Sequence, residues 1–70
     1  MWLVDDGSQT GPFCSFTSRL YYNAGRTDVI LDRHDTSACT FPITSFGFGT
    51  NGRVVYWTDD GQAKWAGVGR

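Results

Sequence analysis

The single histidine of the chain, His34, is the first residue to consider for acid–base chemistry. A histidine base in a hydrolytic site needs a nucleophile and an orienting group around a formed cleft. Ser15 or Ser37 could serve as the nucleophile, but no spacing in the sequence associates either serine with His34. We therefore interpret His34 as a solvated loop residue between an arginine and an aspartate, and we expect no enzymatic activity.

Two pairs of adjacent aspartates, Asp5-Asp6 and Asp59-Asp60, are the candidates for carboxylate chemistry. Neighbouring residues on a strand point to opposite faces, so they make poor acid–base partners, and aspartate is common in tight turns. We interpret both pairs as turn residues. Four carboxylates could surround calcium if the two turns met, but no EF-hand spacing is present. One histidine and two cysteines at no standard spacing do not provide a zinc set either, so we expect no metal and no cofactor.

The two cysteines, Cys14 and Cys39, are 25 residues apart. A chain of 70 residues buries only about 60% of its unfolded surface, so a small core needs a supplement. A disulfide across this loop would contribute roughly 3 kcal/mol, and the spacing is not the Cys-x-x-Cys of redox pairs. The cysteines therefore predict a structural disulfide and a secreted or periplasmic protein, although two thiols also fit a reduced cytosolic chain.

Net charge narrows the choice of partners. Six basic residues against seven acidic ones give a net charge of −1, which offers no electrostatic surface for nucleic acid or an anionic membrane. No apolar run approaches the roughly 20 residues of a membrane-spanning helix. We expect a protein target or a glycan as partner, and a monomer or weak homo-oligomer.

The elements that must position these residues are predicted to be strands. Short runs rich in Val, Ile, Thr and aromatic residues alternate with Gly, Asn and Asp, which is typical of an all-β domain. We predict one domain, 1–70, forming a small Greek-key β-sandwich or barrel of about six short antiparallel strands. The irregular segment 33–42 is where the crossover is expected. The predicted strands are 2–4, 13–22, 28–32, 43–48, 53–58 and 62–66, with Val29 and Leu31 facing inward.

The stretch "FGFGTNGRVVYW", residues 46 to 57, gives the clearest local prediction. Asn51-Gly52 favours a type I′ hairpin turn, and Asp60-Gly61 offers the same turn chemistry again. Alternation places Val54 and Tyr56 on one face and Val55 and Trp57 on the other. If Phe46 and Phe48 pack inward with Val54 and Tyr56, Trp57 is the residue left to meet a partner.

A family resemblance covers about two thirds of the chain. Phe16 and Tyr21 have the aromatic spacing that opens a βγ-crystallin-type Greek key, and Thr44-Ser45-Phe46 and "NGRVVYW" resemble its later strands. Small secreted bacterial versions, which include metalloprotease inhibitors, have cysteines placed like Cys14 and Cys39. Asn23 stands where the family has glycine. Thr40 and Phe41 occupy the positions of its calcium ligands, so the resemblance does not imply calcium binding.

Two functions follow as expectations. The first is an inhibitor-like or toxin-like protein-binding module that uses the loop 33–41, tethered by Cys39, with Arg33, His34 and Asp35 in contact with the target. The second is a carbohydrate-binding module, because eleven aromatic residues exceed what so small a core easily holds. The aromatic candidates for this surface are Tyr56, Trp57 and Trp65. The chain is also similar in size and composition to small β-sandwich effectors secreted by plant-pathogenic fungi.

Overall fold

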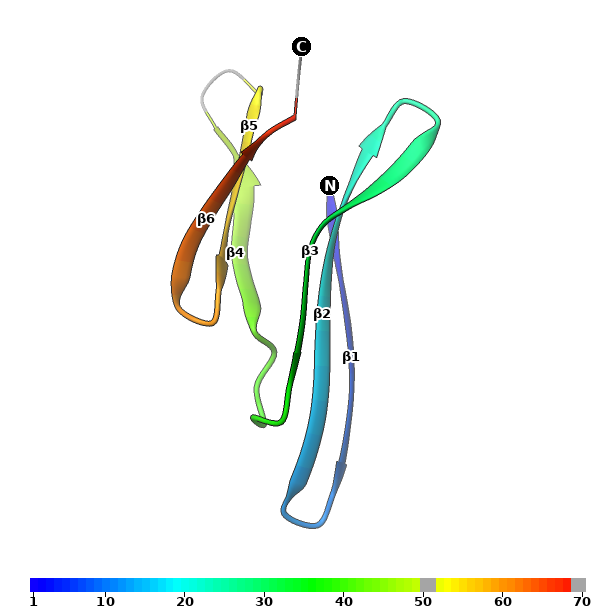
Figure 1. Ribbon diagram of the computed structural model, residues 1–70, viewed down its shortest axis with the longest axis vertical. Helices are drawn as coiled ribbons and strands as arrows, with labels where there is room; N and C mark the ends of the chain where they lie inside the picture. The colour runs from blue at the N-terminus through cyan, green and yellow to red at the C-terminus, as the bar shows by residue number, and fades with distance from the viewer. Residues whose placement is uncertain (50–51, 69–70) are drawn as a thin grey trace.

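Six antiparallel strands form the protein in a computed structural model, which describes residues 1–49 and 52–68 (Figure 1). The all-β prediction and the number of strands are confirmed. Within the described part of the chain there is no helix that could cross a membrane. The strands are β1 (Trp2–Thr10), β2 (Phe13–Ala24), β3 (Thr27–Thr36), β4 (Ile43–Phe48), β5 (Val54–Asp59) and β6 (Gln62–Gly67).

The strands form two three-stranded sheets, β1-β2-β3 and β4-β5-β6, which lie beside each other in Figure 1. Among the described residues each strand pairs only with its neighbours in the sequence, so both sheets are antiparallel meanders. A Greek key needs a fourth strand that returns beside the first. The predicted Greek-key order is therefore corrected to two consecutive meanders, because a short turn closes each hairpin and leaves segment 37–42 as the one link between the sheets.

The turn between β5 and β6 is the one that the sequence predicted. Asp60 and Gly61 both have positive φ angles, 51° and 82°, as a type I′ turn requires. Gly52 also has a positive φ, and the N–H of Gly49 donates to the carbonyl of Val54 at 2.6 Å across the β4–β5 hairpin. The hairpin is thus confirmed, whereas Asn51 of its predicted turn lies outside the described residues.

The first aspartate pair does not form a turn, contrary to prediction. β1 continues through Asp5 and Asp6 to Thr10 and pairs with β2 along its whole length. Ser18 donates a hydrogen bond of 2.7 Å to Asp5, and Arg19 forms an ion pair with Asp6. These cross-strand partners on β2 let the two carboxylates remain within a strand.

The core lies between the sheets. The buried cluster contains Leu20 from β2, Ile43 from β4, and Val55 and Trp57 from β5. Ser18 is also buried and accepts a hydrogen bond of 3.4 Å from the Ile43 N–H, which ties the first sheet to the second. Partly buried residues packed around the cluster are Met1, Leu3, Leu31, Ala66 and Val68.

Two of the predicted orientations are wrong. Trp57 is only 5% exposed and belongs to the core, whereas Tyr56 is 49% exposed. The inward face of β5 is therefore the one that carries Val55 and Trp57. Leu31 packs against the core as predicted, but Val29 is exposed, because its end of the β2–β3 hairpin diverges from the second sheet (Figure 1).

The predicted disulfide is present and joins Cys14 of β2 to Cys39 of the segment between the sheets. Close to it, the rings of Phe16 and Phe41 stack with their centroids 4.7 Å apart. The segment is therefore attached to the lower part of the β1–β2 hairpin by one covalent bond and one aromatic contact.

Candidate functional site

The three residues predicted to form a binding loop lie instead in strand β3, which extends to Thr36 because β2 continues to pair with it. Arg33 and Asp35 are exposed and form an ion pair at 3.4 Å. A hydrogen bond from Thr17 holds the pKa of Asp35 below its usual range. His34 makes its contact across the sheets instead, so the three side chains do not form one loop surface.

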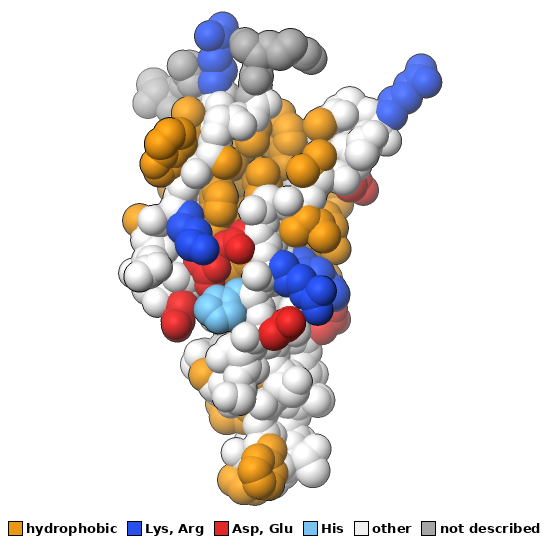
Figure 2. Space-filling model, viewed as in Figure 1, with side chains coloured by type: hydrophobic (Ala, Val, Ile, Leu, Met, Phe, Trp, Pro, Cys, Tyr) orange, Lys and Arg blue, Asp and Glu red, His pale blue; other side chains and the backbone are white. Residues whose placement is uncertain are grey.

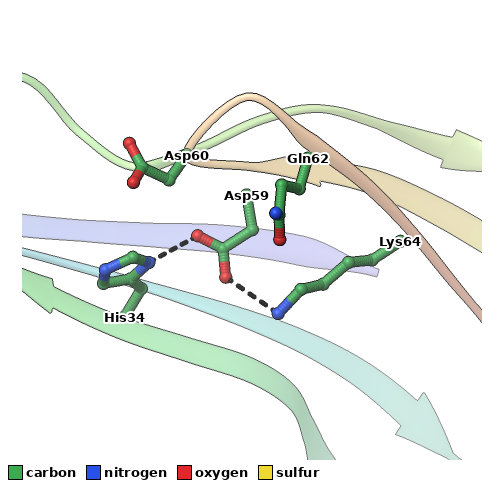
Figure 3. Close-up of a pocket in the computed structure, with 5 residues that line it drawn as sticks. All are labelled: His34, Asp59, Asp60, Gln62 and Lys64. Carbon is green, nitrogen blue, oxygen red and sulfur yellow. Dashed lines mark hydrogen bonds and ion pairs between the residues drawn. The ribbon is translucent and has the colours of Figure 1, made fainter.

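His34 belongs to a polar cluster that spans the two sheets (Figure 3). Its Nδ1 lies 2.6 Å from Oδ1 of Asp59, which stands at the end of β5. The Nζ atom of Lys64, on β6, lies 3.4 Å from Asp59 Oδ2 and 3.6 Å from Asp32 Oδ2. The indole N–H of Trp57 donates to Asp32 Oδ2 at 2.8 Å. We call Asp32, His34, Trp57, Asp59 and Lys64 the inter-sheet cluster.

The burial of Asp59 explains why its carboxylate needs the charged and hydrogen-bonding partners of this cluster. Asp59 is only 5% exposed, and a buried carboxylate is costly unless it is paired and hydrogen-bonded. Asp59 was predicted to be a turn residue, which is wrong, because it continues the inward alternation of Val55 and Trp57. This period of two was a sequence signal that places Asp59 on the same face as Val55 and Trp57.

The pairing shifts the acid–base equilibria of the cluster. The hydrogen bond to Asp59 raises the pKa of His34 above its ordinary value of 6.5. Burial acts to raise the pKa of Asp59, but contacts with Asp32 and His34 outweigh it and hold this pKa below its usual range. The nearby charge of Asp32 raises the pKa of Lys64. These shifts favour the charged forms of all three groups, and the His34–Asp59 and Lys64–Asp32 contacts join the two sheets.

A hollow of about 230 Å³ lies over this cluster (Figure 3). In the part of the chain that the structure describes, its lining contains no serine, threonine or cysteine that could act as a nucleophile beside His34. Within residues 1–49 and 52–68, no group of three or more His, Cys, Asp or Glu side chains is placed to hold a metal ion. Its lining consists of His34, Asp59, Asp60, Gln62 and Lys64.

A different surface lies where the disulfide joins two segments. The turn at Gly11-Pro12 carries Phe13, which is 76% exposed, directly before Cys14. Phe41, on the other side of the disulfide, is also exposed. We call residues 10–16 and 37–41 the disulfide-braced end.

The disulfide-braced end differs from the rest of the surface in its charge. The chain has no charged residue from Gly7 to Ser18, nor from Thr36 to Gly52. Figure 2 shows Asp, Lys, Arg and His side chains in the middle and upper parts of the visible face, and only polar and apolar groups at the lower end. The sequence prediction did not identify Phe13 as a site residue. The two uncharged runs, each of which contains one of the cysteines, were a sequence signal that could have indicated this surface.

The outer face of the second sheet carries two further exposed aromatic residues, Tyr56 and Trp65. Trp65 is 73% exposed and lies opposite Tyr56 in the register of β5 and β6. Of the three predicted aromatic binding residues, the structure thus brings Tyr56 and Trp65 together on one exposed face. It places Trp57 on the opposite face, in the core.

No protein-family model, no curated protein and no solved structure matches this chain. The resemblance to βγ-crystallin-type domains therefore stays a prediction.

Proposed function

We propose that this chain is a secreted or periplasmic, non-enzymatic protein-binding module, inhibitor-like or toxin-like, that binds its target through the disulfide-braced end. The observation that carries the proposal is the exposure of Phe13, next to Cys14, at the tip of the β1–β2 hairpin. In Figure 1 this tip extends past the lower end of the second sheet, which leaves it accessible to a partner.

The composition of this end supports a protein partner. The centres of protein interfaces are depleted of charged residues and enriched in aromatic ones. The disulfide-braced end has no charged residue, and it presents Phe13 and Phe41 among serine, threonine and glycine. An anionic partner such as nucleic acid would need basic residues at the contact, and this end has none.

Rigidity supports the same proposal. The disulfide closes a loop of 25 residues, and the stacking of Phe16 on Phe41 gives the segment a second attachment. Ordering a mobile group when a complex forms costs free energy and lowers the affinity. A segment that is already fixed before binding therefore retains more of its contact energy. The bridge therefore serves the interface as well as the stability of the fold.

The disulfide also supports the proposed location, because such bonds persist in secreted and periplasmic proteins and are rare in the cytosol. The non-enzymatic part of the proposal is supported by the inter-sheet cluster. Among the described residues, the hollow over this cluster is lined by no serine, threonine or cysteine that could act as a nucleophile beside His34. We expect no cofactor.

The test compares the intact, oxidised protein with two exposed variants. The protein is immobilised through its N-terminus, which lies at the far end of β1 from the hairpin tip. Captured proteins are identified, and their affinities are measured by calorimetry. Phe13→Ser should weaken binding by roughly 30-fold or more, as expected for a hot-spot residue worth about 2 kcal/mol. Arg33→Ala, in an exposed ion pair on β3, is the matched control and should bind like the unaltered protein.

The opposite pattern would refute the proposal. If Phe13→Ser binds every captured protein as tightly as the unaltered chain, the disulfide-braced end is not the binding surface. If Arg33→Ala loses affinity while Phe13→Ser retains it, the contact lies along β3 instead.

A further inference from the structure

We infer that the outer face of the second sheet is a separate binding site for neutral polysaccharide, with Tyr56 and Trp65 as its stacking platform. This site is independent of the disulfide-braced end and uses residues of β4, β5 and β6. The inference goes beyond protein binding to a second ligand class on the same small domain.

The two aromatic residues are neighbours by register. Tyr56 and Trp65 lie directly opposite each other in the antiparallel pairing of β5 and β6, so both side chains leave the same face of the sheet. Trp57 and Lys64, the next pair along, belong to the inter-sheet cluster on the other face. The platform is therefore fixed by the same alternation that buries Trp57.

A glycine on the neighbouring strand β4 leaves room for the Tyr56 ring. Gly47 of β4 lies opposite Tyr56, and a Cβ added at Gly47 would come within 2.8 Å of the Tyr56 hydroxyl oxygen. The tyrosine ring thus lies over the Gly47 backbone, in space that any other residue would fill. Tyr56 consequently covers β4, and the exposed Trp65 extends the aromatic surface on the other side of β5, over β6.

The surroundings of the platform are uncharged. On the same face, the next residues along each strand lie two positions from Tyr56 and Trp65. Among the described residues, those that pair within the sheet carry no charge. Two of them, Thr44 and Thr58, have hydroxyl groups that can both donate and accept hydrogen bonds. The remaining members of this face are Val54, Ala63 and Gly67.

These features fit a neutral sugar polymer better than other ligands. The C–H faces of pyranose rings stack on aromatic rings, and their hydroxyls can bond the threonines. Nucleic acid would require basic side chains at the contact. A standard protein interface needs about 800 Å² on each partner. At their exposures of 49% and 73%, Tyr56 and Trp65 offer roughly 300 Å² of aromatic surface, which suits a few sugar rings.

The experiment measures depletion of the full, oxidised chain by insoluble cellulose and insoluble chitin, and its retardation in gels containing soluble β-glucan. Binding to at least one of these probes is expected, with at least a tenfold loss of affinity in Trp65→Ala and in Tyr56→Ala. Phe13→Ala removes an equally exposed aromatic residue elsewhere and is the matched control, which should bind normally.

A second measurement guards against variants that fold poorly. In the unaltered protein, the bound polysaccharide should protect tryptophan fluorescence from acrylamide, because Trp65 is far more exposed than Trp2 or Trp57. The inference is overturned if none of the three probes binds, if Trp65→Ala binds as well as the unaltered protein, or if Phe13→Ala loses affinity equally.

Discussion

Removal of the disulfide should cost a large part of the stability of this domain. The bridge spans 25 residues, and the chain-entropy relation for a loop of this length gives about 3.5 kcal/mol at 25 °C. A 70-residue domain has a total stability of roughly 3.5 to 10 kcal/mol, so the expected loss is between a third and nearly all of it. The melting temperature should fall by about 15 to 25 °C.

The assay is urea and thermal unfolding of the oxidised chain and of the Cys14→Ala/Cys39→Ala variant, followed by circular dichroism. Added reductant should lower the midpoint of the unaltered protein towards that of the variant, and it should leave the variant unchanged. A loss of less than about 1 kcal/mol would refute the reasoning. In that case the four-residue core and the inter-sheet cluster would hold the two sheets together without the bridge.

Three further predictions concern the core, the inter-sheet cluster and the aromatic face. Leu20→Ala should destabilise the fold by about 2–5 kcal/mol, measured by urea unfolding, whereas Val29→Ala on the exposed hairpin should cost under 1 kcal/mol. Because the pKa of His34 is raised in the folded state, its stabilisation is fully present below a pH of about 6.5 and is lost as the pH rises through the folded pKa. His34→Gln should reduce this fall of the unfolding free energy with rising pH, and an unchanged stability–pH curve would contradict the His34–Asp59 pairing. Gly47→Val should displace the Tyr56 ring and weaken polysaccharide binding with the platform residues intact, which depletion assays would detect.

The sequence was sufficient for features that depend on local chemistry. The Asp60-Gly61 turn, the β4–β5 hairpin and the all-β class follow from turn residues and alternation, which act over a few positions. The Cys14–Cys39 bridge followed from counting, because two cysteines allow only one pairing within the chain. These parts of the fold needed no knowledge of long-range packing.

The choice of faces could not be predicted in the same way. Alternation shows that Val55 and Trp57 share a face, but it does not show whether that face is buried. Contacts with residues far along the chain decide this, since Asp32 accepts the Trp57 N–H and His34 pairs with Asp59. An expectation based on Phe46 and Phe48 therefore chose the wrong side.

The residues of the candidate sites likewise depend on long-range contacts that local sequence patterns do not show. Arg33, His34 and Asp35 were predicted to form a loop because the sequence there lacks strand-forming residues, yet pairing with β2 extends β3 through them. Exposure of Phe13 is likewise a property of the whole fold, since it depends on how far the β1–β2 hairpin extends past the second sheet (Figure 1). Tertiary pairing overrides local propensity at both places.

The most direct test of the proposed function is the affinity of the captured target protein for the Phe13→Ser and Arg33→Ala variants, measured side by side by calorimetry. The proposal predicts that Phe13→Ser binds roughly 30-fold more weakly or worse, and that Arg33→Ala matches the unaltered protein. Equal affinities for Phe13→Ser and the unaltered protein would contradict the assignment of the disulfide-braced end as the binding surface.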